Sequence, residues 1–158
     1  MKTAVVIADT HGNKADLKKL GNIMREADYI IHLGDGYYDL NAFGQEVLEK
    51  TVRIKGNCDD AVGDRETIVE IEGVKLFLTH GDLYGVRGGT NRLLARAKEL
   101  GASVALYGHT HAALIEERSG VTIANPGTLT RYAPQKTFIY AVFSGGKAVL
   151  KINDGTLS

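Results

Sequence analysis

Short apolar segments of this 158-residue chain repeatedly end in glycine-rich turns that carry aspartate, asparagine or histidine. Segments of this kind, rich in β-branched residues, predict buried strands. The expected strands are Thr3–Ala8, Tyr29–Leu33, Val52–Lys55, Lys75–Leu78 and Ser103–Tyr107. The polar residues that follow them are Asp9, His11, Asp35, Asn57, His80, His109 and His111. Ligands of α/β proteins bind where the carboxyl ends of strands meet, so these side chains are expected to converge.

The remaining segments predict the layout of a mixed-sheet α/β domain. An amphipathic helix over Ala15–Ala27 and a second over about Thr90–Leu100 are indicated by apolar residues at helical spacing. Asp39 is expected to cap a helix between the second and third strands. Hairpins are expected to pair Thr67–Ile71 with Lys75–Leu78, Ala113–Glu117 with Val121–Ala124, and Phe138–Phe143 with Ala148–Ile152. Parallel βαβ units at the front and hairpins behind favour the α/β class.

Composition restricts the function classes. One domain over residues 1–158 is expected from the length. The formal net charge is zero and aromatic residues make up 7%, which disfavours a nucleic-acid surface. The single cysteine, Cys58, cannot form an internal disulfide, which suits a reducing compartment. No apolar run is long enough to span a membrane and no signal peptide is recognised, so a cytoplasmic protein is expected.

The residue types that follow the strands are those that hold transition metals. Carboxylate oxygen and neutral imidazole suit manganese, iron, zinc, cobalt or nickel, whereas the set has no thiolate of a structural zinc site. Asp9 and His11 are two residues apart, as are His109 and His111, so each pair can aim both side chains the same way. Asp35 is alone in its turn and is the expected bridge between two ions.

The ordered series Asp-x-His, Gly-Asp, Gly-Asn, His-Gly and Gly-His-x-His resembles the calcineurin-like metallophosphoesterases. The form Gly-Asn-Cys-Asp and the turn Asn125-Pro126-Gly127-Thr128 are similar to the small prokaryotic YfcE-type phosphodiesterase branch. The resemblance implies a four-layer α/β/β/α sandwich of two mixed sheets flanked by helices. It implies one divalent ion, with manganese favoured, on Asp9, His11, Asp35 and His111, and a second on Asp35, Asn57, His80 and His109.

The resemblance also implies a reaction. A hydroxide that bridges two ions about 3.5–4 Å apart attacks the phosphorus of a small phosphodiester in line with the leaving alkoxide. Asn57 and Cys58 are the expected catalytic residues, and Arg131 is the expected substrate contact. Many phosphatases of this superfamily carry a histidine where this chain has Cys58, and a neutral thiol is a poor acid. Poor leaving groups are therefore expected to react slowly.

Several neighbouring residues have a plainer interpretation. His32 is expected to be a satisfied core histidine or a support for a ligand rather than a ligand itself. Cys58 is expected to be a small buried filler rather than a nucleophile, and Asp59 to orient a histidine. Asp82 stands where the small branch often has a histidine, and it is interpreted as a loop-capping acid.

Two other functions compete with the enzyme. A protein-binding scaffold of the same fold, resembling the retromer subunit, could lose metal ligands, but here every ligand position is filled. A nuclease would need a basic groove with stacking aromatics. The tyrosines Tyr37 and Tyr38 beside Asp35 could either wall the site or form a homodimer contact.

Overall fold

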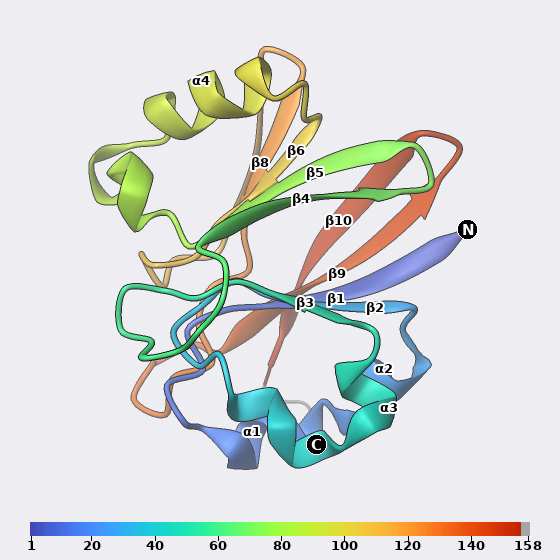
Figure 1. Ribbon diagram of the computed structural model, residues 1–158, viewed down its shortest axis with the longest axis vertical. Coiled ribbons are helices and arrows are strands. Elements are labelled where there is room, and N and C mark those ends of the chain that lie inside the picture. The colour runs from blue at the N-terminus through green and yellow to red at the C-terminus, as the bar shows by residue number, and fades with distance from the viewer. Residues whose placement is uncertain (156–158) are drawn as a thin grey trace.

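The computed structural model describes residues 1–155 and contains two five-stranded sheets packed face to face (Figure 1). The first sheet has the order β10-β9-β1-β2-β3. Its strands are β1 (Lys2–Ile7), β2 (Tyr29–His32), β3 (Thr51–Arg53), β9 (Thr137–Ser144) and β10 (Lys147–Asp154). β1, β2 and β3 are parallel, and β9 and β10 add as an antiparallel hairpin. The parallel half therefore ends in loops at one edge.

The second sheet has the order β4-β5-β6-β8-β7. Its strands are β4 (Glu66–Ile71), β5 (Val74–Thr79), β6 (Val104–Leu106), β7 (Leu114–Arg118) and β8 (Val121–Asn125). β5, β6 and β8 are parallel, whereas β4 and β7 pair antiparallel at the two borders. All three hairpins predicted from the sequence are present, and both sheets are mixed.

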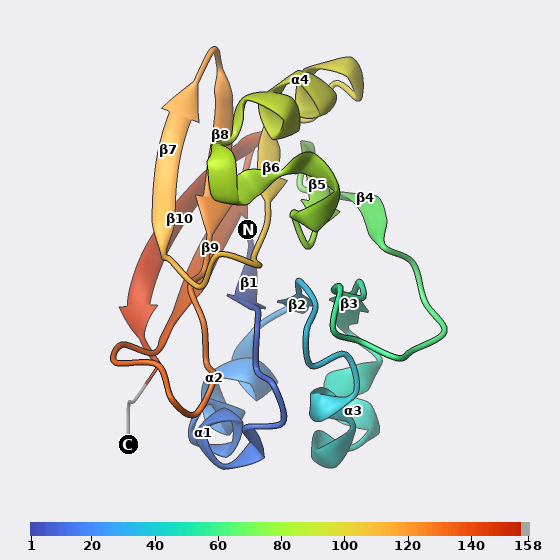
Figure 2. The ribbon, with the colours of Figure 1, turned by 90° about the vertical axis from the view of Figure 1, so that its left-hand side faces the viewer.

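Helices cover the outer face of each sheet (Figures 1 and 2). The helical elements are α1 (Lys14–Lys19), α2 (Gly21–Glu26), η1 (Asp39–Phe43), α3 (Gln45–Leu48), η2 (Asp82–Tyr84), η3 (Val86–Gly88) and α4 (Asn91–Glu99). α1, α2 and α3 lie against the first sheet, and α4 lies against the second. This arrangement confirms the expected four-layer α/β/β/α sandwich. None of the helices within residues 1–155 combines the length and the apolar character that a membrane crossing requires.

The alternation of β1 shows how the layers form. Ala4, Val6 and Ala8 pack into the apolar layer between the sheets, together with residues of the second sheet. Val5 and Ile7 point the other way and pack against Leu17 and the other apolar residues of the first helical layer. Successive side chains of a strand face opposite sides, so a strand that is apolar throughout must be covered on both faces.

Two local expectations were wrong in detail. The helix expected over Ala15–Ala27 is divided into α1 and α2 at Leu20, directly before Gly21, a residue that costs a helix interior about 1 kcal/mol relative to alanine. Asp39 does not cap a helix with its side chain. It lies inside the first turn of η1, and its carboxylate accepts hydrogen bonds from the hydroxyl of buried Thr10 and from the backbone N–H of Gly12.

Candidate metal centre

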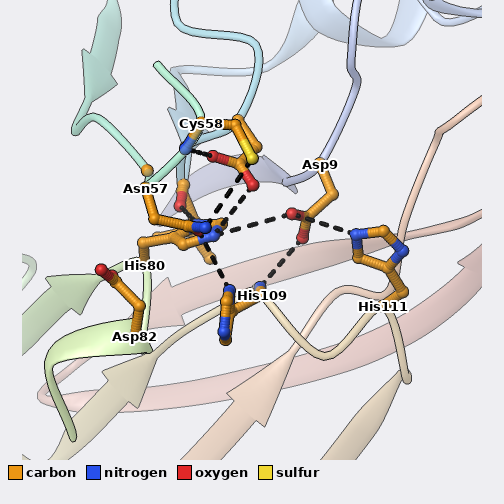
Figure 3. Close-up of polar contacts among 12 residues, drawn as sticks. Asp9, Asn57, Cys58, His80, Asp82, His109 and His111 are labelled. Atoms are coloured by element: carbon orange, nitrogen blue, oxygen red, sulfur yellow. Dashed lines mark hydrogen bonds and ion pairs between the residues drawn. The ribbon is translucent and has the colours of Figure 1, made fainter. Parts of the chain in front are cut away.

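The polar residues predicted from the sequence meet where the carboxyl ends of the two sheets approach one another (Figure 3). Asp9 and His11 follow β1, Asp35 follows β2 and Asn57 follows β3 in the first sheet. In the second sheet, His80 follows β5, and His109 and His111 follow β6. The expected convergence therefore occurs, and it draws on both sheets rather than on one.

One group of ligand atoms surrounds Asp9. Nε2 of His111 lies 3.4 Å from Oδ1 of Asp9, and Nε2 of His11 lies 3.7 Å from the same oxygen. The two imidazole rings are 5.4 Å apart at their centroids. Ligand atoms of these three residues all lie within 4.8 Å of one another, which is compact enough to hold one ion.

A second group surrounds His80. Nε2 of His80 lies 3.2 Å from Oδ2 of Asp35, and Nδ1 of His109 lies 3.1 Å from Oδ1 of Asn57. The rings of His80 and His109 are 5.1 Å apart. The compact group of ligand atoms here consists of Asp9, Asp35 and His80, all within 4.8 Å of one another, while His109 and Asn57 lie beside it.

The two carboxylates lie between the groups. Oδ2 of Asp35 is 3.8 Å from Nε2 of His11 in the first group, and Oδ1 of Asp9 is 3.8 Å from Nε2 of His80 in the second. The backbone N–H of Cys58 occupies the other oxygen of Asp35, at 2.9 Å, so Oδ2 alone is free to face the ligands. Asp35 thus has the position of a bridge. Asp9 has a comparable position, which the sequence pattern did not reveal.

Two buried atoms at this site lack a hydrogen-bond partner within residues 1–155: Oδ1 of Asp9 and Nε2 of His80. Nδ1 of His80 lies 2.7 Å from the carbonyl oxygen of Leu33, so this nitrogen carries a proton and donates it. In neutral His80, Nε2 then presents a lone pair to the carboxylate of Asp35. Since lone pairs repel, a cation or a second proton must lie between them, and the donor set fits a divalent metal.

The pKa shifts show how the metal-free site distributes its protons. Burial opposes ionisation of Asp9 and Asp35, but contacts with histidines outweigh it and hold the pKa of both carboxyl groups below the usual range. The hydrogen bond to Asp9 raises the pKa of His11. Burial lowers the pKa of His80, but the neighbouring carboxylates outweigh that effect and raise it. Burial lowers the pKa of His109. In the metal-free protein, protons on His11 and His80 therefore supply the positive charge that a bound metal would otherwise provide.

Most of the expected ligands adopt a left-handed backbone conformation. Positive φ angles occur at Asp9 (54°), His11 (45°), Asp35 (59°), His109 (69°) and His111 (65°). The other non-glycine residues with positive φ in the described chain are Glu72 and Ser119, which lie in hairpin turns. Residues with side chains adopt this region at a cost, and the surrounding contacts must hold them there. The strain is concentrated at the candidate site.

Gly34 allows the two sheets to approach at the site. Its φ is 102°, and a Cβ atom at this position would lie 2.6 Å from the backbone nitrogen of Gly56 and 2.9 Å from Nδ1 of His80. No other residue fits, because each of these distances is shorter than real Cβ contacts allow. Gly34 is therefore required at this position because the backbone of Gly56 and the ring of His80 lie so close to it.

His32 connects the loop that carries Asp9 to the loop that carries Asp35 through two hydrogen bonds. The N–H of Gly34 donates to Nδ1 of His32 at 3.0 Å, so Nε2 carries the proton and bonds Oγ1 of Thr10, also at 3.0 Å. Thr10 in turn donates to Oδ2 of Asp39 at 2.5 Å. Burial lowers the pKa of His32 to about 4, which keeps the ring neutral. The expectation of a satisfied, buried histidine is confirmed.

The turn after β8 supports the site from the other side. The side-chain amide of Asn125 donates to the carbonyl of Gly108 and to the hydroxyl of Thr110, at 3.1 and 3.0 Å. The hydroxyl of Thr128 donates to the carbonyl of Asp9 at 2.8 Å. The Asn-Pro-Gly-Thr sequence thus ties the loop of His109 to the loop of Asp9. In the sequence, this turn is recognisable only through the family resemblance.

Asp59 and Cys58 differ from their expected roles. Within the described part of the chain, Asp59 forms no hydrogen bond or ion pair with a histidine; its carboxylate accepts hydrogen bonds from the backbone N–H groups of Asp35, Gly36, Tyr37 and Gly56. Asp59 therefore shapes the turn that holds Asp35 because four amides point at it. Cys58 is exposed and is not a buried filler. Its limited burial and the negative charge of Asp35 raise the pKa of its thiol, so the thiol is neutral near pH 7.

The other residues singled out from the sequence lie around the rim. Asp82 begins η2 and pairs with Arg65 at 2.7 Å, while its side chain makes no cap bond to the turn. The guanidinium of Arg53 lies over the ring of Tyr37 at 4.5 Å. Arg131 is exposed in the loop after β8, and within residues 1–155 it forms no hydrogen bond or ion pair.

A sandwich of two mixed sheets with histidines and carboxylates at the shared carboxyl edge defines a class of metal-binding hydrolases. Residues 1–147 match the family model of the calcineurin-like phosphoesterase superfamily domain. The chain is 32% identical over 142 residues to the probable metallophosphoesterase YsnB of Bacillus subtilis, covering 89% of this chain and 82% of that protein. The chain belongs to the calcineurin-like phosphoesterase superfamily.

Two further relatives bear on the branch and the fold. Phosphodiesterase YfcE of Escherichia coli is 34% identical over 95 residues, which are 54% of this chain and 47% of YfcE. Its solved structure superposes with a TM-score of 0.65 at 20% identity, over 96% of this chain and 98% of YfcE. Vacuolar protein sorting 29 of Cryptosporidium parvum has the same fold, with a TM-score of 0.80 at 18% identity over 97% of both chains. The resemblance to the YfcE-type branch is thereby confirmed.

Proposed function

We propose that this protein is a metal-dependent phosphodiesterase that hydrolyses small phosphodiesters. The proposal is supported by two compact groups of candidate metal ligands, Asp9 with His11 and His111 and Asp9 with Asp35 and His80, and by two buried atoms that lack partners within residues 1–155, Oδ1 of Asp9 and Nε2 of His80. Burying such atoms unpaired costs about 1–3 kcal/mol each, which a bound cation offsets. Its relative YfcE is named a phosphodiesterase, which supports the same reaction class.

Two divalent ions are proposed, with manganese as the expected metal. Asp9, His11, Asp35 and His111 would hold the first, and Asp35, Asn57, His80 and His109 would hold the second. Bound there, the ions would activate water and polarise the phosphate ester. A chain with one unpaired cysteine suits the reducing cytoplasm, which remains part of the proposal.

The residues of the chain itself limit which esters can react. Asn57 and Cys58 are exposed at the mouth of the site, and the backbone N–H of Cys58 fixes Asp35. The thiol, with its raised pKa, is a weak acid and gives little help to a poor leaving group. Diesters with good leaving groups are therefore favoured over alkyl monoesters. Arg131, exposed and unpaired within residues 1–155, is retained as a proposed phosphate contact.

The test combines metal analysis with hydrolysis. Protein reconstituted with manganese should contain about two ions per chain and hydrolyse bis(4-nitrophenyl) phosphate, and a chelator should abolish turnover. Asp35→Asn should lose both properties, whereas Asp60→Asn, the same change at an exposed aspartate nearby, should keep them. Absence of bound metal after reconstitution would sink the proposal.

The rival function is a protein-binding scaffold. It is favoured by the fold shared with vacuolar protein sorting 29. A scaffold gains nothing from a full set of ligands in left-handed conformations, which are costly to maintain. Two bound metals without hydrolysis of any diester would favour the scaffold over the enzyme.

A further inference from the structure

A cavity of about 590 Å³ opens beside the candidate metal centre. It lies between the start of the segment that leads into β7 and the loop that follows β8, and its lining comes from residues 111–113 and from positions 128, 130, 132–135 and 137. Pockets for small ligands have volumes of about 300–1,000 Å³, so the space is large enough for a ring system.

His111 connects this cavity to the metal centre. Its Nε2 lies 3.4 Å from Oδ1 of Asp9, and the same side chain lines the cavity. A phosphate held by the ligands of the metal centre would therefore have one of its ester substituents directed toward this space. Because the cavity adjoins the metal centre, an ester substituent of the substrate is the group expected to occupy it.

Among residues 1–155, no acidic or basic side chain lines the cavity apart from the imidazole of His111. Ala113, Pro134 and the ring of Tyr132, which is 87% exposed, supply apolar surface. Thr130 and Gln135 supply polar groups, and their side chains form no hydrogen bond within residues 1–155. Such a lining suits an uncharged planar group with hydrogen-bonding edges and disfavours a second phosphate.

The neighbouring cavity has a different character. It shares Ala112 and Ala113 with the first cavity, has a volume of about 550 Å³, and includes the charged side chains of Arg87 and Glu116. A neutral ring therefore matches the first cavity better than the second, because charged groups lose hydration when a neutral ring covers them.

We propose that the cavity lined by His111, Tyr132 and Pro134 binds an uncharged aromatic ring of the phosphodiester, such as a nucleobase. This inference rests on the proposed function, because a phosphate at the metal centre sets the position of the ring. Tyr132 and Pro134 provide the faces for stacking, while Thr130 and Gln135 contact the edge of the ring.

The test compares two phosphate monoesters that differ by the base. Binding of adenosine 5′-monophosphate and of ribose 5-phosphate to the manganese-loaded protein is measured by titration calorimetry. The nucleotide should bind about 5- to 100-fold more tightly, as base stacking on an aromatic side chain allows. Tyr132→Ala and Ala113→Trp, which remove the stacking face and fill the space, should both reduce that advantage without weakening ribose 5-phosphate.

Leu114→Ala is the matched control, since Leu114 is exposed, apolar and lines the neighbouring cavity instead. It should leave the advantage of the nucleotide intact. Equal affinity for the two monoesters, or an advantage that survives both Tyr132→Ala and Ala113→Trp, would overturn the inference. If the protein hydrolyses bis(4-nitrophenyl) phosphate but binds adenosine 5′-monophosphate no more tightly than ribose 5-phosphate, the proposed ring site is wrong and the proposed function stands. Preference for the nucleotide without any diester hydrolysis would instead overturn the proposed function.

Discussion

Nε2 of His80 lies 3.2 Å from Oδ2 of Asp35, and no hydrogen of the neutral ring can fill that gap because Nδ1 donates to the carbonyl of Leu33. The pair is compatible either with a second proton on the ring or with a cation between the two atoms. Proton and metal therefore compete for one position, and this competition makes metal binding depend on pH.

Metal affinity should rise with pH. The hydrogen bond to Asp9 raises the pKa of His11 above 6.5, and at His80 the carboxylates outweigh burial and raise it likewise. Ligation requires the deprotonated ring, so below these pKa values protons oppose binding and above them they do not. Manganese titrations in buffers of different ionisation enthalpy should detect proton release near pH 6.5 and little at high pH. Affinity independent of pH would contradict this account.

The melting temperature should rise on addition of manganese. At a free metal concentration of 100 times Kd, mass action adds about 2.7 kcal/mol, or roughly 5–10 °C for a domain of this size. The shift should be larger at pH 8 than at pH 6. In the metal-free protein, histidines with raised pKa values stabilise the fold below pH 6.5 and lose that contribution as pH rises through their folded pKa. Scanning calorimetry at both pH values measures the shift in melting temperature on addition of manganese. Asp9→Asn should show a smaller shift than the unaltered protein.

Asp35→Asn should damage the site more than His32→Asn does. Asp35 contacts histidines of both ligand groups and would supply charge to both proposed ions, whereas His32 acts only through Thr10 and Gly34. The His32 change should cost about 10–100-fold in metal affinity, the range for a residue that supports a ligand. Metal titration of the two variants checks the order, with circular dichroism as the control for folding. Equal losses would show that His32 has been assigned the wrong role.

Cys58→His should raise monoesterase activity relative to diesterase activity. An imidazolium at this exposed position could protonate a poor leaving alkoxide, and a well-placed general acid contributes about 10²–10⁴-fold. Rates with 4-nitrophenyl phosphate, an alkyl monoester and bis(4-nitrophenyl) phosphate give the ratio. An unchanged ratio would remove the leaving-group explanation but would leave the metal centre in place.

Cys58→Ala provides the complementary experiment. Diester turnover should remain largely unchanged, because the thiol is neutral near pH 7 and the structural contact with Asp35 comes from the backbone N–H. Loss of diester hydrolysis with both metals still bound would mean that the thiol takes part in the chemistry.

The sequence determined the composition of the site because ligand type and strand position are both local properties. Asp9, Asp35 and His80 each follow an apolar run, and parallel strands of one sheet place their carboxyl ends at the same edge. The glycine beside Asp35 could be identified in the same way. The four-layer sandwich, by contrast, came from the family resemblance, since periodicity alone indicated only a mixed α/β domain.

Tertiary structure decided what the local pattern could not. The partners of Asp59, the exposure of Cys58 and the buried chain from His32 through Thr10 to Asp39 depend on which loops meet at the carboxyl edge of the first sheet. The bonds from Thr128 to Asp9 and from Asn125 to Gly108 join residues 119 and 17 positions apart. Such contacts have no period along the chain; they form where strands pair within a sheet, as for Asn125 and Gly108, and where the two sheets pack together, as for Thr128 and Asp9. That packing fixes where each ligand points.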